Sequence, residues 1–135
     1  MRFTPLSEEE IKESNLFEPG IYNFEVLEAL DKISKSGNEM IELKIKIWDN
    51  NGKEKIIYDY LLEMMKFKLK HFSECVSLED KYNDGGINAN DCIGKSGELD
   101  LIIYVDKKGR YADKNAVKDY IVNKDKNDIS DDIPF

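Results

Sequence analysis

Strict alternation of apolar and polar residues from Ile41 to Trp48 is the feature that most restricts how this chain can fold. Isoleucine or leucine takes each odd position from 41 to 47, and a charged residue takes each even position from 42 to 46. Successive side chains of a strand point to opposite faces, so this segment predicts a strand with one buried face. Asp49-Asn50-Asn51-Gly52 follows, and Asn and Gly accept the positive φ of a tight turn. We therefore predict a β-hairpin whose second strand runs from about Lys53 to Leu62.

The turn also predicts the register of this hairpin. A three-residue loop at 50–52 with Gly52 in the left-handed region places Lys44 opposite Tyr58 and Ile45 opposite Ile57. In that register the two isoleucines are buried. One outer surface then carries Lys44, Lys46, Tyr58 and Tyr60. A two-residue loop would instead place Lys46 opposite Ile57 and move both tyrosines to the other side.

Other segments extend the pattern on both sides of the hairpin. Tyr22, Phe24 and Val26 predict a strand that begins at Ile21, followed by a polar loop at 31–38. Apolar residues at helical spacing predict a helix over 63–77; they are Met65, Leu69, Phe72 and Val76. A turn-rich stretch at 83–97 has room for one helical turn. Two more strands are expected at 98–105 and 111–122, with Leu99, Leu101, Ile103 and Val105 on one face of the first.

The predicted order is β-β-β-α-β-β, which is the layout of the five-stranded OB-fold barrel. We expect an all-β domain with one helix over residues 21–122. Residues 1–20 read as an N-terminal lead-in, in which Ser7 and Glu10 match a capping box for a short helix at 8–14. Residues 123–135 lose the apolar pattern and read as a flexible acidic tail.

The balance of charge limits the possible partners. The 135 residues carry a formal net charge of −8, which excludes a generally cationic surface for nucleic acid. Positive charge is nevertheless concentrated in two segments, since residues 32–70 hold nine lysines and six acids and residues 104–118 hold five cations and two acids. These segments include the strands and loops that bind ligands in OB-folds. A chain with 36% charged residues also shows such fluctuations by chance, and this alternative stays open.

Aromatic residues lie among these cations, as in proteins that bind single strands. Base–aromatic stacking contributes about 1–3 kcal/mol per base without regard to sequence, while Lys and Arg contact phosphates. Tyr104, Arg110 and Tyr111 flank the last predicted hairpin turn. Rings that merely pack at the barrel ends are the alternative. The candidate DNA-binding residues are Lys32, Lys35, Lys44, Lys46, Trp48, Lys55, Tyr58, Tyr60, Lys107, Lys108, Arg110 and Tyr111.

The last five residues, Asp131-Asp132-Ile133-Pro134-Phe135, form the sharpest motif. A terminal Phe presents a ring and a carboxylate together, which suits an apolar pocket with a basic rim. Asp131 and Asp132 would add long-range attraction to such a partner. We therefore expect these five residues to dock a partner protein.

This ending resembles the acidic tip of bacterial single-stranded DNA-binding proteins. The rest of the chain resembles a phage-encoded family of OB-fold single-stranded DNA-binding proteins. The segments that carry the resemblance are FTPLSEEEIKESNLFEPGIYNFEV (3–26), SKSGNEMIELKIKIWDNNGKE (34–54), KLKHF (68–72), GKSG (94–97) and DKNAVKDYI (113–121). It implies a protein that coats single-stranded DNA and recruits replication, recombination and repair enzymes through its tip. The tetrameric assembly of the bacterial proteins is not implied, and a homodimer stays open.

Two catalytic or metal-binding alternatives are weaker. Asp31 with Glu42-Leu43-Lys44 imitates the Asp…Glu-x-Lys site of Mg²⁺-dependent nucleases, but such spacing is common in Lys/Glu-rich strands. His71, Cys75 and Cys92 lack the paired spacing and fourth ligand of a zinc site. We expect no enzyme activity, no cofactor and no metal. An adaptor that binds only proteins remains the main alternative.

The absence of a long apolar run or signal peptide predicts a soluble chain without membrane contact. Its two cysteines, Cys75 and Cys92, are too few for a disulfide framework, so we expect reduced thiols. Together with the family resemblance, this predicts a protein of the cytoplasm of a bacterial host cell.

Overall fold

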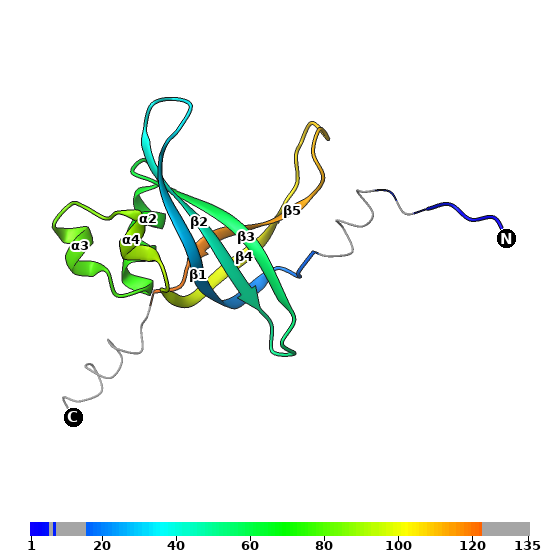
Figure 1. Ribbon diagram of the computed structural model, residues 1–135, viewed down its shortest axis with the longest axis horizontal. Helices are drawn as coiled ribbons and strands as arrows, with labels where there is room; N and C mark the ends of the chain where they lie inside the picture. Colours follow the sequence, from blue (N-terminus) through cyan, green and yellow to red (C-terminus); the bar gives the residue numbers. More distant parts are fainter. Residues whose placement is uncertain (6, 8–15, 123–135) are drawn as a thin grey trace.

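The computed structural model describes residues 1–5, 7 and 16–122 and shows a mostly β protein with short helices on one side (Figure 1). The strands are β1 (Gly20–Ile33), β2 (Glu39–Trp48), β3 (Glu54–Leu62), β4 (Ser96–Tyr104) and β5 (Lys114–Tyr120). The helices are α2 (Lys66–Cys75), α3 (Glu79–Asn83) and α4 (Ala89–Cys92). No helix in these described ranges is long and apolar enough to cross a membrane. The helix expected at 8–14 and the tail at 123–135 lie outside the described residues.

The five strands form one antiparallel sheet in the order β3-β2-β1-β4-β5. β1 is the longest strand, and it pairs with β2 on one side and with β4 on the other. Its pairing with β2 shifts between Val26 and Glu28, and such a bulge bends a strand and increases its twist. Within the part of the chain that the structure describes, no backbone ladder joins the outer strands β3 and β5.

The hairpin register predicted from the turn is confirmed. Gly52 has a φ of +83°, Lys44 pairs with Tyr58, and Ile45 pairs with Ile57. The Asp49 carboxylate accepts hydrogen bonds from the backbone N–H groups of Asn51 and Lys53, both at 2.9 Å, which stabilises the turn. As the register requires, both isoleucines are buried, whereas the Tyr58 side chain is exposed.

The core fills the space between the inner face of the curved sheet and α2. Its buried apolar residues include the predicted alternating set of β2 and residues of β1 and β4; those that are fully buried in these strands are Phe24, Val26, Leu43, Ile45, Ile47, Leu99 and Leu101. Phe72 of α2 packs edge-on against Tyr120 of β5, with the ring centroids 4.9 Å apart. The α2 face predicted from spacing is therefore correct at Phe72 and Val76, but Met65 is exposed and precedes the helix.

Phe17 of the expected lead-in is also buried in the core. The buried Asn115 side chain of β5 holds it there. The Phe17 N–H donates to Asn115 Oδ1 at 2.8 Å, and Asn115 Nδ2 donates to the Phe17 carbonyl at 2.9 Å. This side chain thus satisfies both backbone groups of one residue, as a neighbouring strand would.

Several predicted boundaries were wrong. Asp31 to Ile33 belong to β1 and not to a loop, because they pair with the start of β2; the loop is 34–38. Cross-strand pairing here overrides the polar composition that predicted a loop. β5 is shorter than 111–122, and Val105 lies beyond β4 and is exposed. The turn-rich stretch holds the expected single turn as α4, but α3 before it was not predicted.

A polar network connects β3, β5 and α2 where the ladder is missing. The buried Asp59 carboxylate of β3 accepts hydrogen bonds from the Lys68 ammonium at 2.8 Å and from the Tyr120 hydroxyl at 2.7 Å. Lys68 also donates to the Val117 carbonyl of β5 at 3.1 Å. Burial, followed by the charge of Asp59 and its hydrogen bond, raises the pKa of Tyr120 well above the ordinary value. Side chains therefore connect the two outer strands.

Gly97 of β4 allows the end of α2 to approach the sheet. A Cβ at this position would lie 2.5 Å from Cys75 Sγ and 3.4 Å from the Phe24 ring. We expect Gly97→Ala to lower the free energy of unfolding by about 1–3 kcal/mol, because the buried Cys75 side chain or the end of α2 must shift to relieve the overlap. Thermal and denaturant unfolding measure this loss. Gly86→Ala is the matched control, since a Cβ there meets nothing within 4 Å; an equal loss in both variants would contradict the packing argument.

Candidate nucleic-acid interface

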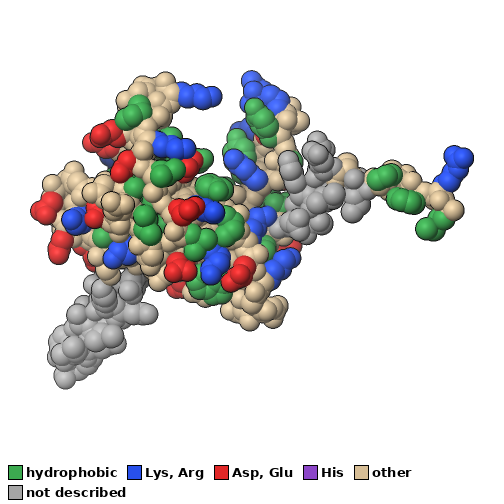
Figure 2. All heavy atoms as spheres, viewed as in Figure 1, with side chains coloured by type: hydrophobic (Ala, Val, Ile, Leu, Met, Phe, Trp, Pro, Cys, Tyr) green, Lys and Arg blue, Asp and Glu red, His purple; other side chains and the backbone are tan. Residues whose placement is uncertain are grey.

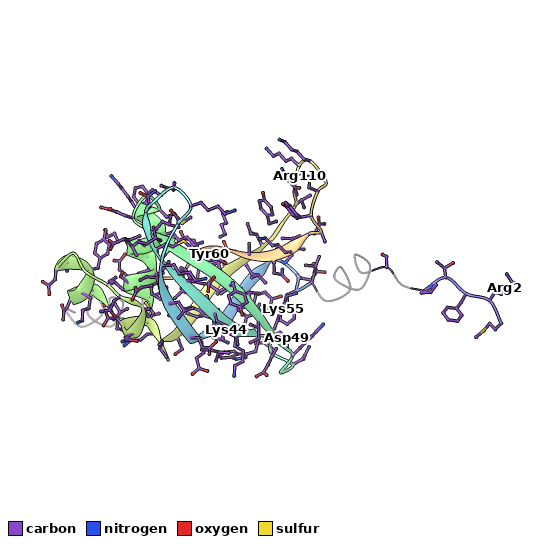
Figure 3. The ribbon with its side chains drawn as sticks, turned by 45° about the horizontal axis from the view of Figure 1, so that its top comes forward. Arg2, Lys44, Asp49, Lys55, Tyr60 and Arg110 are labelled. Atoms are coloured by element: carbon purple, nitrogen blue, oxygen red, sulfur yellow. The ribbon has the colours of Figure 1, made fainter. Side chains whose placement is uncertain are left out.

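Two loops project from the same side of the molecule, at 34–38 between β1 and β2 and at 105–113 between β4 and β5 (Figure 1). Figure 2 shows a hollow between these projections, with cationic and apolar side chains on its walls. Tyr60 of β3 lies below the space between the loops, and Arg110 lies near the tip of the second loop (Figure 3). We call this space the inter-loop cleft. It brings β3 and two loops distant in sequence to one place.

Exposed tyrosines lie on the elements around the cleft. The exposed fractions are 52% for Tyr58, 38% for Tyr60, 51% for Tyr104 and 73% for Tyr111. Burial, together with a hydrogen bond to the cross-strand neighbour Glu42, raises the pKa of Tyr60. These rings are accessible to a ligand. If they only packed at the barrel ends, we would expect them to be less exposed.

Cations accompany two of these rings. The Arg110 guanidinium carbon lies 5.5 Å from the centroid of Tyr111, and Lys114 Nζ lies 5.8 Å from the centroid of Tyr104. Lys114 was absent from the predicted set. The register of the hairpin places it opposite Tyr104, and the sequence leaves this register open because the loop between the two strands is long.

Asp106 shapes the loop that presents these cations. Its carboxylate accepts a hydrogen bond from the Arg110 backbone N–H at 2.8 Å and from Arg110 Nε at 3.4 Å. Desolvation would raise the pKa of Asp106, but hydrogen bonds from the backbone of Arg110 and Lys108 outweigh it and lower the pKa below the ordinary value. Lys107 and Lys108 remain exposed around this turn. Lys35 is exposed in the 34–38 loop across the cleft, where Ser34 accepts a hydrogen bond from Asn38.

The outer face of β1, β2 and β3 carries glutamates beside the lysines that pair across from Tyr58 and Tyr60. Lys44 pairs with Glu28 at 3.3 Å, and Lys32 pairs with Glu42 at 3.1 Å. Lys46 lies between two glutamates, Glu25 at 3.9 Å and Glu54 at 3.6 Å. Because the glutamates of β1 join this face, the positive segment at 32–70 does not form a positive surface there. Three predicted DNA-binding lysines thus have carboxylate partners.

Trp48 and Lys55 also lie apart from the cleft. Trp48 is half-buried at the end of β2 opposite the 34–38 loop, and Lys46 Nζ lies 5.6 Å from its ring centroid. A shallow hollow of about 290 Å³ adjoins this ring. Lys55 is on the face of β3 that also carries Ile57, opposite to Tyr58 and Tyr60. Burial and the charge of Lys53 lower the pKa of Lys55.

The residues of the nuclease alternative do not come together. Asp31 and Glu42 lie on opposite faces of the sheet, since Asp31 pairs with the buried Ile41. The Asp31 carboxylate accepts a hydrogen bond from the Ala89 N–H at 3.0 Å and so fixes the start of α4. Glu42 pairs with Lys32. Both carboxylates thus have structural roles.

The residues of the zinc alternative are separated as well. His71 Nδ1 lies 2.8 Å from the Asp119 carboxylate, and the free thiols of Cys75 and Cys92 are buried. Burial, with the neighbouring charges of Asp91 and Asp31, raises the pKa of Cys92 to about 12. Across residues 1–5, 7 and 16–122, no three His, Cys, Asp or Glu side chains form a group that could hold a metal ion.

Comparison of the chain with protein-family models and with curated proteins finds no match.

Proposed function

We propose that this protein binds single-stranded DNA without sequence preference and coats it during replication or recombination. The observation that carries the proposal is the inter-loop cleft, which is bordered by elements with exposed tyrosines and by two loops with exposed cations. Rings of this kind can stack on any unpaired base, while Lys107, Lys108 and Arg110 can contact phosphates. Stacking on a base face and contact with a phosphate do not depend on the identity of the base, which favours binding without sequence preference.

Duplex DNA is a poorer ligand for this surface. Its bases are already stacked on each other, so the tyrosines gain nothing without unpairing them. Phosphate contacts alone would then have to overcome the net charge of −8 of the chain. A single strand supplies both the base faces and the phosphates that the cleft can use.

We further propose that the fold is a variant of the OB-fold barrel. In support, the central β1 pairs with both β2 and β4, and it contains a bulge that bends the sheet. The Asp59–Tyr120 contact takes the place of strand pairing between β3 and β5. The cleft lies between the β1–β2 and β4–β5 loops, which is where OB-folds bind oligonucleotides.

The proposal predicts binding to oligo-dT that is much tighter than binding to a duplex of equal length. The logarithm of the binding constant should fall against the logarithm of salt concentration with a slope of about −2 to −4, since each phosphate contact contributes about −0.7. Fluorescence anisotropy at several salt concentrations measures both quantities. Lys108→Ala should make the slope less steep by about 0.7, whereas Lys44→Ala, which removes a lysine paired with Glu28, should change it little. Equal affinity for duplex, or no binding of either DNA, would contradict the proposal and favour a protein adaptor.

We also propose that Asp131, Asp132, Ile133, Pro134 and Phe135, which lie outside the described residues, recruit replication, recombination and repair proteins. Phe135→Ala should abolish co-purification of such enzymes from the host and leave affinity for oligo-dT unchanged, because it removes an apolar anchor and no side-chain charge. Asn127→Ala is the control outside the motif. Recruitment that survives Phe135→Ala would exclude the motif as the docking element.

A further inference from the structure

A hollow of about 900 Å³, separate from the hollow beside Trp48, lies on the helical side of the molecule. It is formed by the end of β1, the start of β2, the end of β3, the start of α2 and the segment between α3 and α4. Its apolar lining includes Ile33, Met40, Leu62, Leu69 and Ile87. Ile33 is 64% exposed, so this lining is open to an incoming side chain. We call this feature the helix-side hollow.

The rim of the helix-side hollow is acidic. Asp31, Glu39 and Glu63 lie on it, together with the cations Lys32 and Lys66. Lys32 pairs with Glu42, which does not line the hollow. Of the charged groups on the rim, the three carboxylates therefore outnumber the one cation without this pairing, Lys66. The hollow suits a segment that combines an apolar anchor with positive charge.

The first residues of the chain have this composition. They read Met1-Arg2-Phe3-Thr4-Pro5, and the exposed fractions are 112% for Met1 and 74% for Phe3. An exposed aromatic residue beside an arginine is a common anchor of protein interfaces. Pro5 restricts the backbone and so lowers the entropy lost on docking. We call residues 1–5 the N-terminal arm.

The arm lies far from the helix-side hollow of its own chain. Figure 1 shows the N-terminus at the end of the molecule opposite to α2, α3 and α4, and Figure 3 shows Arg2 well outside the folded body. A contact between two copies therefore fits this arrangement better than a contact within one.

We propose that the N-terminal arm of one copy docks into the helix-side hollow of a second copy. Phe3 enters the apolar lining, and Arg2 lies against the carboxylates of the rim. The two surfaces of this contact differ, so each copy keeps one free arm and one free hollow. Such a heterologous contact builds an open row of copies unless it closes into a ring. The proposal does not depend on DNA binding.

The test uses the full chain and a synthetic peptide of residues 1–5, which corresponds to the arm. In two-dimensional NMR of the ¹⁵N-labelled protein, the peptide should shift the amide signals of Leu69 and Ile87. The peptide with Phe3→Ala should bind about tenfold more weakly or worse, since it loses a buried aromatic side chain. Shifts confined to other surfaces, or no shifts at millimolar peptide, would overturn the proposal.

Sedimentation equilibrium of the full chain tests the contact between copies. Association should rise with concentration, and Phe3→Ala should abolish it without changing the fold, because Phe3 is exposed and outside the core. Thr4→Ala is the control. A monomer at all concentrations would overturn the proposal. The proposal would also be overturned if Phe3→Ala changed the amide signals of Leu69 and Ile87 by the same amount at every protein concentration. That result would indicate that the arm docks into the hollow of its own copy.

A charge exchange tests the acidic rim. Glu63→Lys should weaken peptide binding severalfold, and a peptide with Arg2→Glu should bind this variant better than the natural peptide does. Glu79→Lys makes the same change of charge at an exposed site that does not line the hollow, and should leave binding almost unchanged. Equal effects of Glu63→Lys and Glu79→Lys would contradict the assigned contact.

Discussion

Asp59→Ala is expected to lower the free energy of unfolding by about 3 kcal/mol, because it leaves a buried ammonium without its carboxylate. The side chains of Asp59 and Lys68 are only 10% and 17% exposed, and their atoms are 2.8 Å apart. The variant also removes the acceptor of the buried Tyr120 hydroxyl. Because this network is the polar link between β3 and β5, the loss should separate the two outer strands before the rest of the sheet unfolds. Urea denaturation gives the loss, and hydrogen exchange of β5 amides gives its location.

Asp119→Ala is the matched control for this prediction. Asp119 also pairs with a basic side chain of α2, His71, at 2.8 Å, but both side chains are about one-third exposed. Partly solvated pairs contribute less than about 1 kcal/mol. If both variants lose the same stability, the Asp59 network has no special role in joining the strands.

Tyr120 adds a dependence on pH. Its pKa is raised in the folded state, so the unfolded chain releases this proton first as pH rises above the ordinary value of 10.0. The folded state then binds more protons than the unfolded state, and stability must fall with rising pH in that range. Tyr120→Phe should make the alkaline loss of stability less steep.

Replacing Tyr58 and Tyr60 together with alanine is expected to cause the largest loss of DNA affinity. Each stacked base contributes about 1–3 kcal/mol, so each ring accounts for roughly a 5- to 150-fold change in the dissociation constant. Tyr58 and Tyr60 alternate on the outer face of β3 and are exposed, so their removal should leave the core intact. Anisotropy titrations with oligo-dT measure the change, and thermal unfolding checks that the variant is folded.

Two further variants separate stacking from other roles of these tyrosines. The double change to phenylalanine keeps both rings and should retain most of the affinity. Ile56→Ala removes an exposed apolar side chain from the same face of β3 and should have little effect, since isoleucine has no π-face. A large loss in the phenylalanine variant, or none in the alanine variant, would show that the bases do not stack on β3.

The hairpin of β2 and β3 shows how much of this fold could be predicted from the sequence. Alternation identified the buried face of β2, and Gly52 in a three-residue turn predicted the pairing of Lys44 with Tyr58. Both signals are local, because the period of a strand and the φ of a turn depend on adjacent residues. The boundary of β1 at Ile33 was missed for the opposite reason. Its polar end is a strand only because β2 lies beside it.

The candidate site was predictable to a smaller extent. Arg110 and Tyr111 were found from their positions beside a turn, and Tyr58 and Tyr60 from the hairpin register, but the glutamate partners of Lys44 and Lys46 were not found. Two of these glutamates, Glu25 and Glu28, come from β1, so a count of charges along the chain could not include them. Likewise, strand alternation places Asp59 on the inner face of β3, but its hydrogen-bond partner Tyr120 lies 61 residues further along the chain.

The sequence by itself thus determined which segments form strands and which faces they bury, because nearest neighbours in the chain control both. Only the tertiary structure decided which charges remain available to a ligand. A charge interacts with whatever lies within a few ångströms of it, and the curved sheet brings together residues from β1, β2 and β3 on one face and from two distant loops at the cleft.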